Sequence, residues 1–270
     1  MAMNIFEYYG IKEVANVYFE ALYDEAAGLS DAPYKAGDIV LYLDTLKVST
    51  VETTAENVSA QGGWGNPKLI TWDYGKDINV TLEDAVVSFE ELRTMLGASL
   101  HNASEKRKVT VRLNGEYKLV SGALKSVKLD EEDNHIEPAP KADTKIRYMD
   151  RVHGTRGQAA TLAEIPVEGL KEGDRVILFW EEERDGGDAG EAVELVISPD
   201  TYPGTYRVVG DALIRNKDGK DEAFQFVINK AKMLSEVTLT MQAEGDPSTF
   251  NMTLNVLRDD NGDMMSLIKY

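Results

Sequence analysis

The stretch that decides the fold is Phe250-Asn-Met-Thr-Leu-Asn-Val256, in which apolar and polar residues alternate with a period of two. Successive side chains of a strand point to opposite faces. The alternation therefore predicts an apolar face made of Phe250, Met252, Leu254 and Val256 and a wet face made of Asn251, Thr253 and Asn255. Residues 224–229 and 237–241 alternate in the same way, and Asp, Asn, Gly and Pro turn signals separate the runs. Short strands of this kind indicate an antiparallel meander in a β-sandwich or barrel.

Two longer stretches, residues 38–60 and 68–82, are rich in Val, Thr and Tyr and flank Gly62-Gly-Trp-Gly-Asn-Pro67. Together they predict an extended hairpin that is only weakly apolar, and thus a poor source of core for a monomer. Because open strand edges are templates for pairing, we expect such a hairpin to pair with a neighbouring chain.

One helix is predicted after the hairpin. Ser88 is a plausible N-cap with Glu91 three residues later as its capping-box partner, and Gly97 can end the helix. Phe89, Leu92, Met95 and Leu96 would form its apolar stripe. The fold class expected is mainly β: an antiparallel β-sandwich or barrel with one flanking α-helix and a long hairpin that pairs between subunits.

The rest of the chain gives further strand patterns. Residues 12–23 fit a helix or a strand, and their β-branched and aromatic content favours a strand. We expect further strands at 109–113, 117–120 and 127–129, and a hairpin that joins 176–180 to 192–197 across 184–190. Residues 130–140 are charged and Pro-bearing and predict a linker or exposed loop. A local cluster of cations, Lys145, Arg147, Arg151 and Arg156, follows that loop.

Charge narrows the function. The 270 residues include 47 acidic and 29 basic side chains, a formal net charge of -18. Such a surface repels nucleic acid and anionic membranes, whereas a sequence-reading DNA-binding protein needs the opposite sign. A need for solubility alone would explain the excess of acidic side chains equally well. No apolar run approaches the roughly 20 residues of a membrane span, and the first residues lack the pattern of a secretory signal. We therefore expect no membrane association.

No catalytic or metal-binding pattern stands out. The chain has no cysteine. The three histidines, His101, His135 and His153, stand apart and are expected at the surface, so we expect no metal and no cofactor. Acidic runs such as 259–263 are predicted to be β-turns rather than calcium loops. The protein is not expected to be an enzyme.

The sequence resembles tailed-bacteriophage tail tube (major tail) proteins in both of its end regions. The C-terminal half of those proteins is resembled by residues 204–216, 222–232 and 245–257. Residues 51–63 and 68–85 resemble their long hairpin and helix. The resemblance skips roughly 100–200. It implies one tube-like β-sandwich domain over 1–270, with an insertion or extended loop around 130–190. Six copies would close into a ring, and stacked rings would form a hollow conduit for DNA.

The resemblance also implies partners and a location. The chain would contact itself, a tape measure protein, the tail terminator, baseplate proteins and, in tails that have one, a sheath. DNA would pass without sequence-specific binding. The protein would be assembled in the host cytoplasm and would reside in the virion tail. Acidic side chains of the hairpin are the candidates for lumen or ring-contact charges: Glu52, Glu56, Asp73, Asp77 and Glu83.

Two other functions stay open. A baseplate hub, tube initiator or capsid-decorating protein would be structural in a different place. A carbohydrate-binding or glycan-hydrolysing β-domain would use Trp64, Trp72 or Trp180 as a stacking platform.

Overall fold

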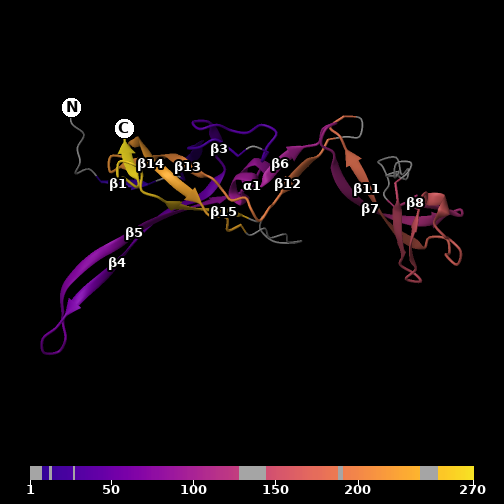
Figure 1. The fold of residues 1–270 in the computed structure, drawn as a ribbon, viewed down its shortest axis with the longest axis horizontal. Helices are drawn as coiled ribbons and strands as arrows, with labels where there is room; N and C mark the ends of the chain where they lie inside the picture. The colour runs from indigo at the N-terminus through magenta and orange to yellow at the C-terminus, as the bar shows by residue number, and fades with distance from the viewer. Residues whose placement is uncertain (1–7, 12–13, 27, 128–143, 188–190, 238–248) are drawn as a thin grey trace. The chain divides into compact units, whose positions relative to one another are not determined.

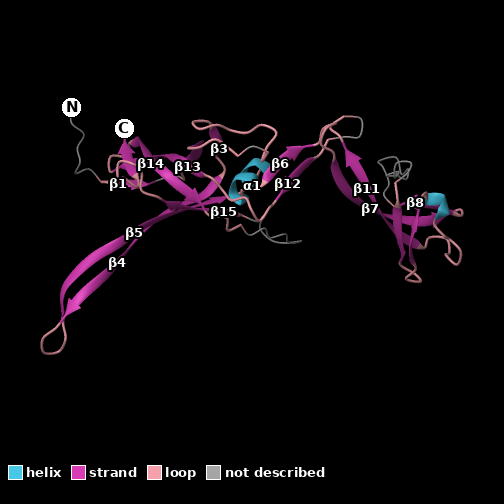
Figure 2. Ribbon diagram, viewed as in Figure 1, coloured by secondary structure: helices cyan, strands magenta, loops and turns pink. Residues whose placement is uncertain are grey.

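The computed structural model describes residues 8–11, 14–26, 28–127, 144–187, 191–237 and 249–270. The chain divides into two compact units. Unit 1 comprises Met1–His101 and Leu195–Tyr270, and unit 2 comprises Asn102–Glu194. Figure 1 follows the chain through both units, and Figure 2 shows that strands dominate each of them. The segment expected to be an insertion, around 130–190, falls within the residue range of unit 2.

Unit 1 is built on one nine-stranded sheet with the order β3-β2-β13-β14-β15-β5-β4, to which β1 and β16 add at β13 and β14. The neighbouring strands of this sheet pair antiparallel. The strands are β1 (Tyr9–Ile11), β2 (Asn16–Ala21), β3 (Ile39–Leu43), β4 (Leu46–Gln61), β5 (Lys68–Asp84), β13 (Thr205–Asn216), β14 (Asp221–Met233), β15 (Phe250–Val256) and β16 (Ser266–Lys269).

The core of unit 1 lies on one face of this sheet, which we call the inner face. Apolar and polar residues alternate along the strands, so the apolar side chains share that face. In β15, Met252, Leu254 and Val256 are buried while Asn251 is exposed, as the period of two predicts. The inner residues of β5, among them Val80 and Leu82, join the same core with residues from β2, β3, β13 and β14. The predicted run 237–241 lies almost wholly outside the described residues. The strand predicted within 12–23 is confirmed as β2.

The one α-helix among the described residues, α1 (Phe89–Leu96), forms where the sequence predicts it. Ser88 accepts a hydrogen bond from the Glu91 amide at 3.1 Å, and the Glu91 carboxylate accepts one from the Ser88 amide at 2.7 Å. Gly97 ends the helix in the left-handed conformation, with φ of 62°. Of the predicted stripe, Met95 is buried in the core, whereas Phe89 is 55% exposed. The stripe is therefore narrower than the sequence suggests.

Unit 2 contains a five-stranded antiparallel sheet with the order β10-β9-β11-β7-β8. Its elements are β7 (Val109–Val120), β8 (Ala123–Ser126), β9 (Ile146–Asp150), β10 (Arg156–Ala159), the 3-10 turn η1 (Leu162–Glu164) and β11 (Arg175–Arg184). A separate core, which includes Tyr117, Leu178 and Trp180, lies on one face of this sheet. Residues 109–120 thus form one strand rather than two.

β6 (Ser99–Asn102) and β12 (Val193–Val196) form a separate two-stranded sheet. The predicted hairpin between 176–180 and 192–197 is therefore wrong, because β11 pairs with β7 and β9 and β12 pairs with β6. Alternation identified both strands, but it carries no information about which strand each one pairs with.

Over the part of the chain that the structure describes, the fold class is confirmed as mainly β, with antiparallel sheets and one α-helix. Within the described residues, the large sheet stays open between its two ends, β3 and β4, and does not close into a barrel. No helix in the described part of the chain is long and apolar enough to span a membrane.

Candidate functional site

The hairpin of β4 and β5 extends beyond the core of unit 1, and most of its residues make no contribution to that core. The two strands pair from Leu46 and Asp84 at the base to Gln61 and Lys68 at the tip, and Figure 1 shows them running side by side away from the other strands of the unit. Residues 50–58 and 63–76 are all exposed. We call residues 52–76 the hairpin arm. Both faces of the arm are open to solvent, which is unusual for so long a pair of strands.

A β-bulge divides the arm from the base of the hairpin. Between the pairs Thr54–Asp77 and Glu56–Tyr74, β5 has one residue more than β4, and Gly75 takes a φ of 61° there. Inserting one residue moves all later side chains of that strand to the other face. The even-numbered residues of β5 therefore face the core from Ile78 to Asp84 and face the opposite way in the arm.

Because of the bulge, apolar side chains of both strands share one face of the arm. We call it the outer face, because it is continuous with the side of β4 and β5 that points away from the core of unit 1. Val58 lies opposite Trp72 and Ala60 lies opposite Ile70, with Tyr74 next along the same face. Val58, Trp72, Ile70 and Tyr74 are each 53–54% exposed. The opposite face of the arm is mostly polar, and Ser59 and Thr71 share a hydrogen bond of 3.0 Å there. We call the five residues Val58, Ala60, Ile70, Trp72 and Tyr74 the apolar stripe.

The register also sorts the five acidic candidates. Glu52, Glu56, Asp77 and Glu83 lie on the face of the apolar stripe, whereas Asp73 lies opposite Asn57 on the other face. Glu52, Glu56 and Asp73 are exposed. Asp77 is half-buried and accepts hydrogen bonds from Asn79 at 3.1 Å and Asn255 at 2.9 Å. Four of the five thus belong to one acidic outer face, and Asp73 is separated from them.

The strand edges of the arm lack partners within the described chain. β4 pairs only with β5, so the other edge of its 16 residues is open. β15 covers β5 only from Asn79 to Asp84, so β5 is open on that side along the arm. Each open edge presents unpaired amide and carbonyl groups that can take up a further strand.

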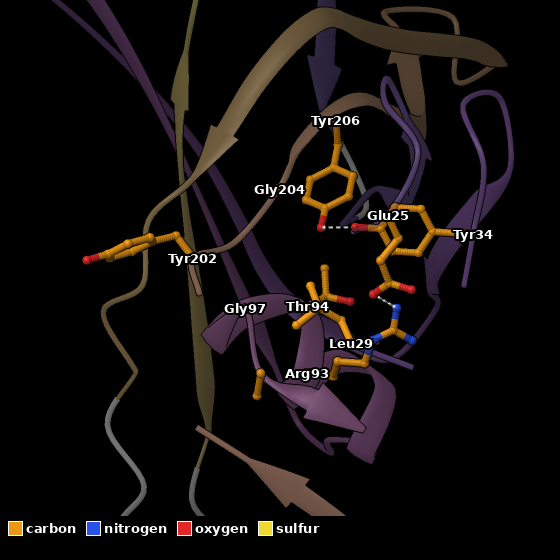
Figure 3. Close-up of a pocket in the computed structure, with 10 residues that line it drawn as sticks. Glu25, Leu29, Tyr34, Arg93, Thr94, Gly97, Tyr202, Gly204 and Tyr206 are labelled. Carbon is orange, nitrogen blue, oxygen red and sulfur yellow. Dashed lines mark hydrogen bonds and ion pairs between the residues drawn. The ribbon is translucent and has the colours of Figure 1, made fainter. Parts of the chain in front are cut away.

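A second site is a polar pocket beside α1, and Glu25, Tyr34, Arg93 and Tyr206 are among the residues that line it. Figure 3 shows Arg93 of the helix pointing toward Glu25, with Tyr34 and Tyr206 above them. Arg93 forms ion pairs with Glu25 and with Glu90, and its guanidinium lies 5.4 Å from the centre of the Tyr34 ring. The hydroxyls of Tyr34 and Tyr206 lie 3.4 Å apart. No local sequence pattern predicts this cluster, because Glu25 and Arg93 are 68 residues apart.

The residues of this pocket hold neighbouring elements together, and the role that fits them is a structural one. Burial, followed by the electrostatic interaction and the hydrogen bond with Tyr34, raises the pKa of Tyr206 far above its ordinary value, so its hydroxyl stays protonated at neutral pH. Burial likewise raises the pKa of Tyr34. Arg93, with 5% of its side chain exposed, joins the helix to the loop before β3. Breaking such a buried pair on one side is costly because it leaves an uncompensated charge.

The remaining candidates are placed as follows. Trp64 is fully exposed at the tip of the arm, whereas Trp180 is 1% exposed in the core of unit 2, so its proposed use as a stacking platform is wrong. His153 is exposed, but His101 is 5% exposed and lies 3.2 Å from Asp31, which corrects the expected surface position. His135 lies outside the described residues. Within the described residues, no group of three His, Asp or Glu side chains is placed to hold a metal ion.

Comparison with known proteins gives one family. No curated protein sequence matches the chain. The model of the YomU/Tube protein family matches residues 9–267, which cover both units. The name of this family indicates a tube-type structural protein of a phage tail. Because the match extends over nearly the whole sequence, the chain belongs to the YomU/Tube protein family.

Proposed function

We propose that the chain is the structural subunit of a phage tail tube, which assembles as stacked hexameric rings into a hollow conduit for DNA. The observation that carries the proposal is the hairpin arm, with two open strand edges and an apolar stripe that nothing in the described chain covers. A second copy can satisfy both features at once. Strands of neighbouring copies would pair along the edges, and the apolar stripe would be buried between them.

The charge of the outer face suits a DNA conduit. Glu52, Glu56, Asp77 and Glu83 share this face by register, and carboxylates repel the phosphates of a passing duplex within about 8 Å at physiological salt. We propose that these four side chains face the lumen or the next ring, and that Asp73 contributes to a different contact. In the tail, the tube would also contact the tape measure, terminator and baseplate proteins.

The apolar stripe sets the size of the expected effect. A tryptophan buries about 150–250 Å², and Trp72 still has 53% of its surface exposed. Covering roughly 100 Å² of it would contribute about 2.5 kcal/mol. Replacing Trp72 by Ser should therefore weaken each contact between copies by roughly 50–100-fold.

The test is negative-stain electron microscopy and sedimentation velocity of the whole chain over a concentration series at moderate salt. The native chain should give rings or tubes with sixfold end views. Trp72→Ser should shift assembly to much higher concentration, while its matched control Asn57→Ser, an exposed residue of the arm on the opposite face, should shift it far less. Monomers at every concentration in the native chain, or equal effects of the two substitutions, would argue against this use of the arm.

One observation favours a second function. Trp64 is fully exposed at the tip between two glycines of positive φ, Gly63 and Gly65. Such a ring can stack on a sugar. If tryptophan fluorescence of a monomeric chain responds to oligosaccharides and Trp64→Ala abolishes the response, a glycan-binding role replaces the tube. Rings without tube growth would instead favour a tube-initiating, baseplate or capsid-decorating subunit.

A further inference from the structure

The sheet of unit 2 has one face on its core and one open face. In β11, Val176, Leu178 and Trp180 are buried, so the residues between them lie on the open face. The pairing carries this alternation across the sheet. Six of the residues that share the open face are cations, and we call them the cationic face: Arg112, Lys118, Lys125, Arg147, Arg156 and Arg175.

The sign of this face is opposite to that of the protein as a whole. By register, the only carboxylates among the described residues of the face are Glu116, Glu181 and Glu183. The chain carries 47 acidic and 29 basic side chains, yet cations outnumber acids here by two to one. The excess acid lies mainly in unit 1, with 27 acidic and 14 basic side chains, against 20 and 15 in unit 2. A locally positive surface in an acidic protein favours an anionic ligand.

Two of the carboxylates are each shared between two arginines. Glu181 lies 3.3 Å from Arg112 and 3.1 Å from Arg147. Glu116 lies 3.3 Å from Arg151 and 3.2 Å from Arg175. All four arginine side chains are more than half exposed. Exposed ion pairs of this kind contribute only about 0–1 kcal/mol, so an incoming anion can replace them at little cost.

An apolar centre lies between the cations. Phe179 stands opposite Asn114 on one side and Arg147 on the other, and Ile177 stands next to Met149. Two shallow hollows flank this centre, and Arg147 and Phe179 line both. Arg156 lines one hollow and Arg112 lines the other. The face therefore offers guanidinium groups around a small apolar surface.

We propose that the cationic face binds a linear polyol-phosphate polymer. Guanidinium groups bind phosphate oxygens through paired hydrogen bonds, and the half-buried ring of Phe179 can cover the carbon backbone between two phosphates. Successive phosphates would lie on Arg112, Arg147 and Arg156, across β7, β9 and β10. This inference does not rest on the proposed tube function, since every residue in it belongs to unit 2.

Two other classes of anion fit the face less well. Single-stranded nucleic acid is bound by aromatic rings that stack on successive bases, and Phe179 is the one aromatic side chain that the register places on this face. An acidic protein surface needs about 800 Å² of contact with an apolar centre, and three half-buried side chains supply far less. A flexible, saturated polymer with regularly spaced phosphates needs only what the face offers.

The test uses the whole chain and fluorescently labelled poly(glycerol phosphate), with binding followed by anisotropy from 50 to 300 mM salt. With three or four phosphates engaged, the affinity should fall with salt with a logarithmic slope of about -2 to -3. The double variant Arg147→Gln/Arg156→Gln should bind at least tenfold more weakly and should lose about 1 or more of this slope. Phe179→Ala should weaken binding without changing the slope.

A matched control removes the same charge elsewhere in unit 2. Lys106→Gln/Lys171→Gln changes two exposed cations outside the sheet and should leave the affinity within about twofold. The fluorescence of the buried Trp180 checks that each variant keeps unit 2 folded. Equal weakening by both double variants, tighter binding of single-stranded DNA of matched charge, or no binding at 50 mM salt would each overturn the proposal. A change in self-association with unaltered polymer binding would overturn it as well.

Discussion

The contrast between the base and the arm of β5 can be measured with two leucines of the same strand. Leu82 is 0% exposed in the core of unit 1, whereas Leu69 is 64% exposed near the tip. Replacing Leu by Ala removes three carbons. At Leu82 this costs about 2.4 kcal/mol of transfer free energy, and the cavity left behind brings the total to about 3–5 kcal/mol. At Leu69 the same change should cost no more than about 0.5 kcal/mol.

The assay is urea denaturation at a concentration below assembly. Far-UV circular dichroism follows both units, and fluorescence follows unit 2 through its buried Trp180, because Trp64 and Trp72 are already exposed. With a slope of roughly 2 kcal/mol per molar urea, Leu82→Ala should lower the midpoint of the unit 1 transition by roughly 1.5–2.5 M. The reasoning is refuted if Leu69→Ala costs as much as Leu82→Ala, because the arm would then be packed in the isolated chain.

Three further predictions concern the helix and unit 2. Ser88→Ala removes the capping box and should lower the free energy of unfolding by about 1 kcal/mol in thermal melts; no change would mean that the cap contributes nothing. Gly97→Ala should cost clearly more than Gly63→Ala: both glycines have positive φ, but only a Cβ at Gly97 meets the backbone of Tyr202. For Asp150, burial alone would raise the pKa, but hydrogen bonds from the Val152 and His153 amides and the His153 ring lower it below 3.8. A depressed pKa contributes stability above the unfolded pKa that is lost as the pH falls through the folded pKa. Asp150→Asn should therefore destabilise unit 2 at pH 7 and have progressively less effect below about pH 4, whereas a constant difference down to pH 2 would contradict the assignment.

Local sequence patterns were enough to predict the helix with its two ends, a β-turn and the buried face of a strand. The capping box at Ser88 and the end at Gly97 depend on residues within one or two turns, so the sequence contains all of their determinants. The same holds for the turn at Asp259, whose side chain accepts hydrogen bonds from the Asn261 and Asp263 amides at 2.9 and 2.8 Å. Alternation in β15 predicted its buried face because one side of the sheet is dry.

The candidate sites depend on contacts between distant residues. The apolar stripe of the arm exists only because the bulge at Gly75 moves Trp72 and Tyr74 to the outer face. Counting along β5 alone would place them on the same face as Ile78. Arg147 and Arg156 were recognisable as a local cluster of cations. Arg112 and Arg175 join them only because β7 and β11 pair beside β9.

By itself, the sequence determined the mainly β class, the long hairpin, the position of the helix and its caps, and the strongly acidic surface. Each of these follows from residue type and short-range periodicity, which act over a few residues. The tertiary structure alone decided which strands pair, where unit 2 begins and ends, which face of the arm is apolar, and that Glu25 meets Arg93. These features depend on strand register and on the meeting of residues far apart in the chain, and the free energy that selects among the alternatives comes from burying one sheet face rather than from any local preference.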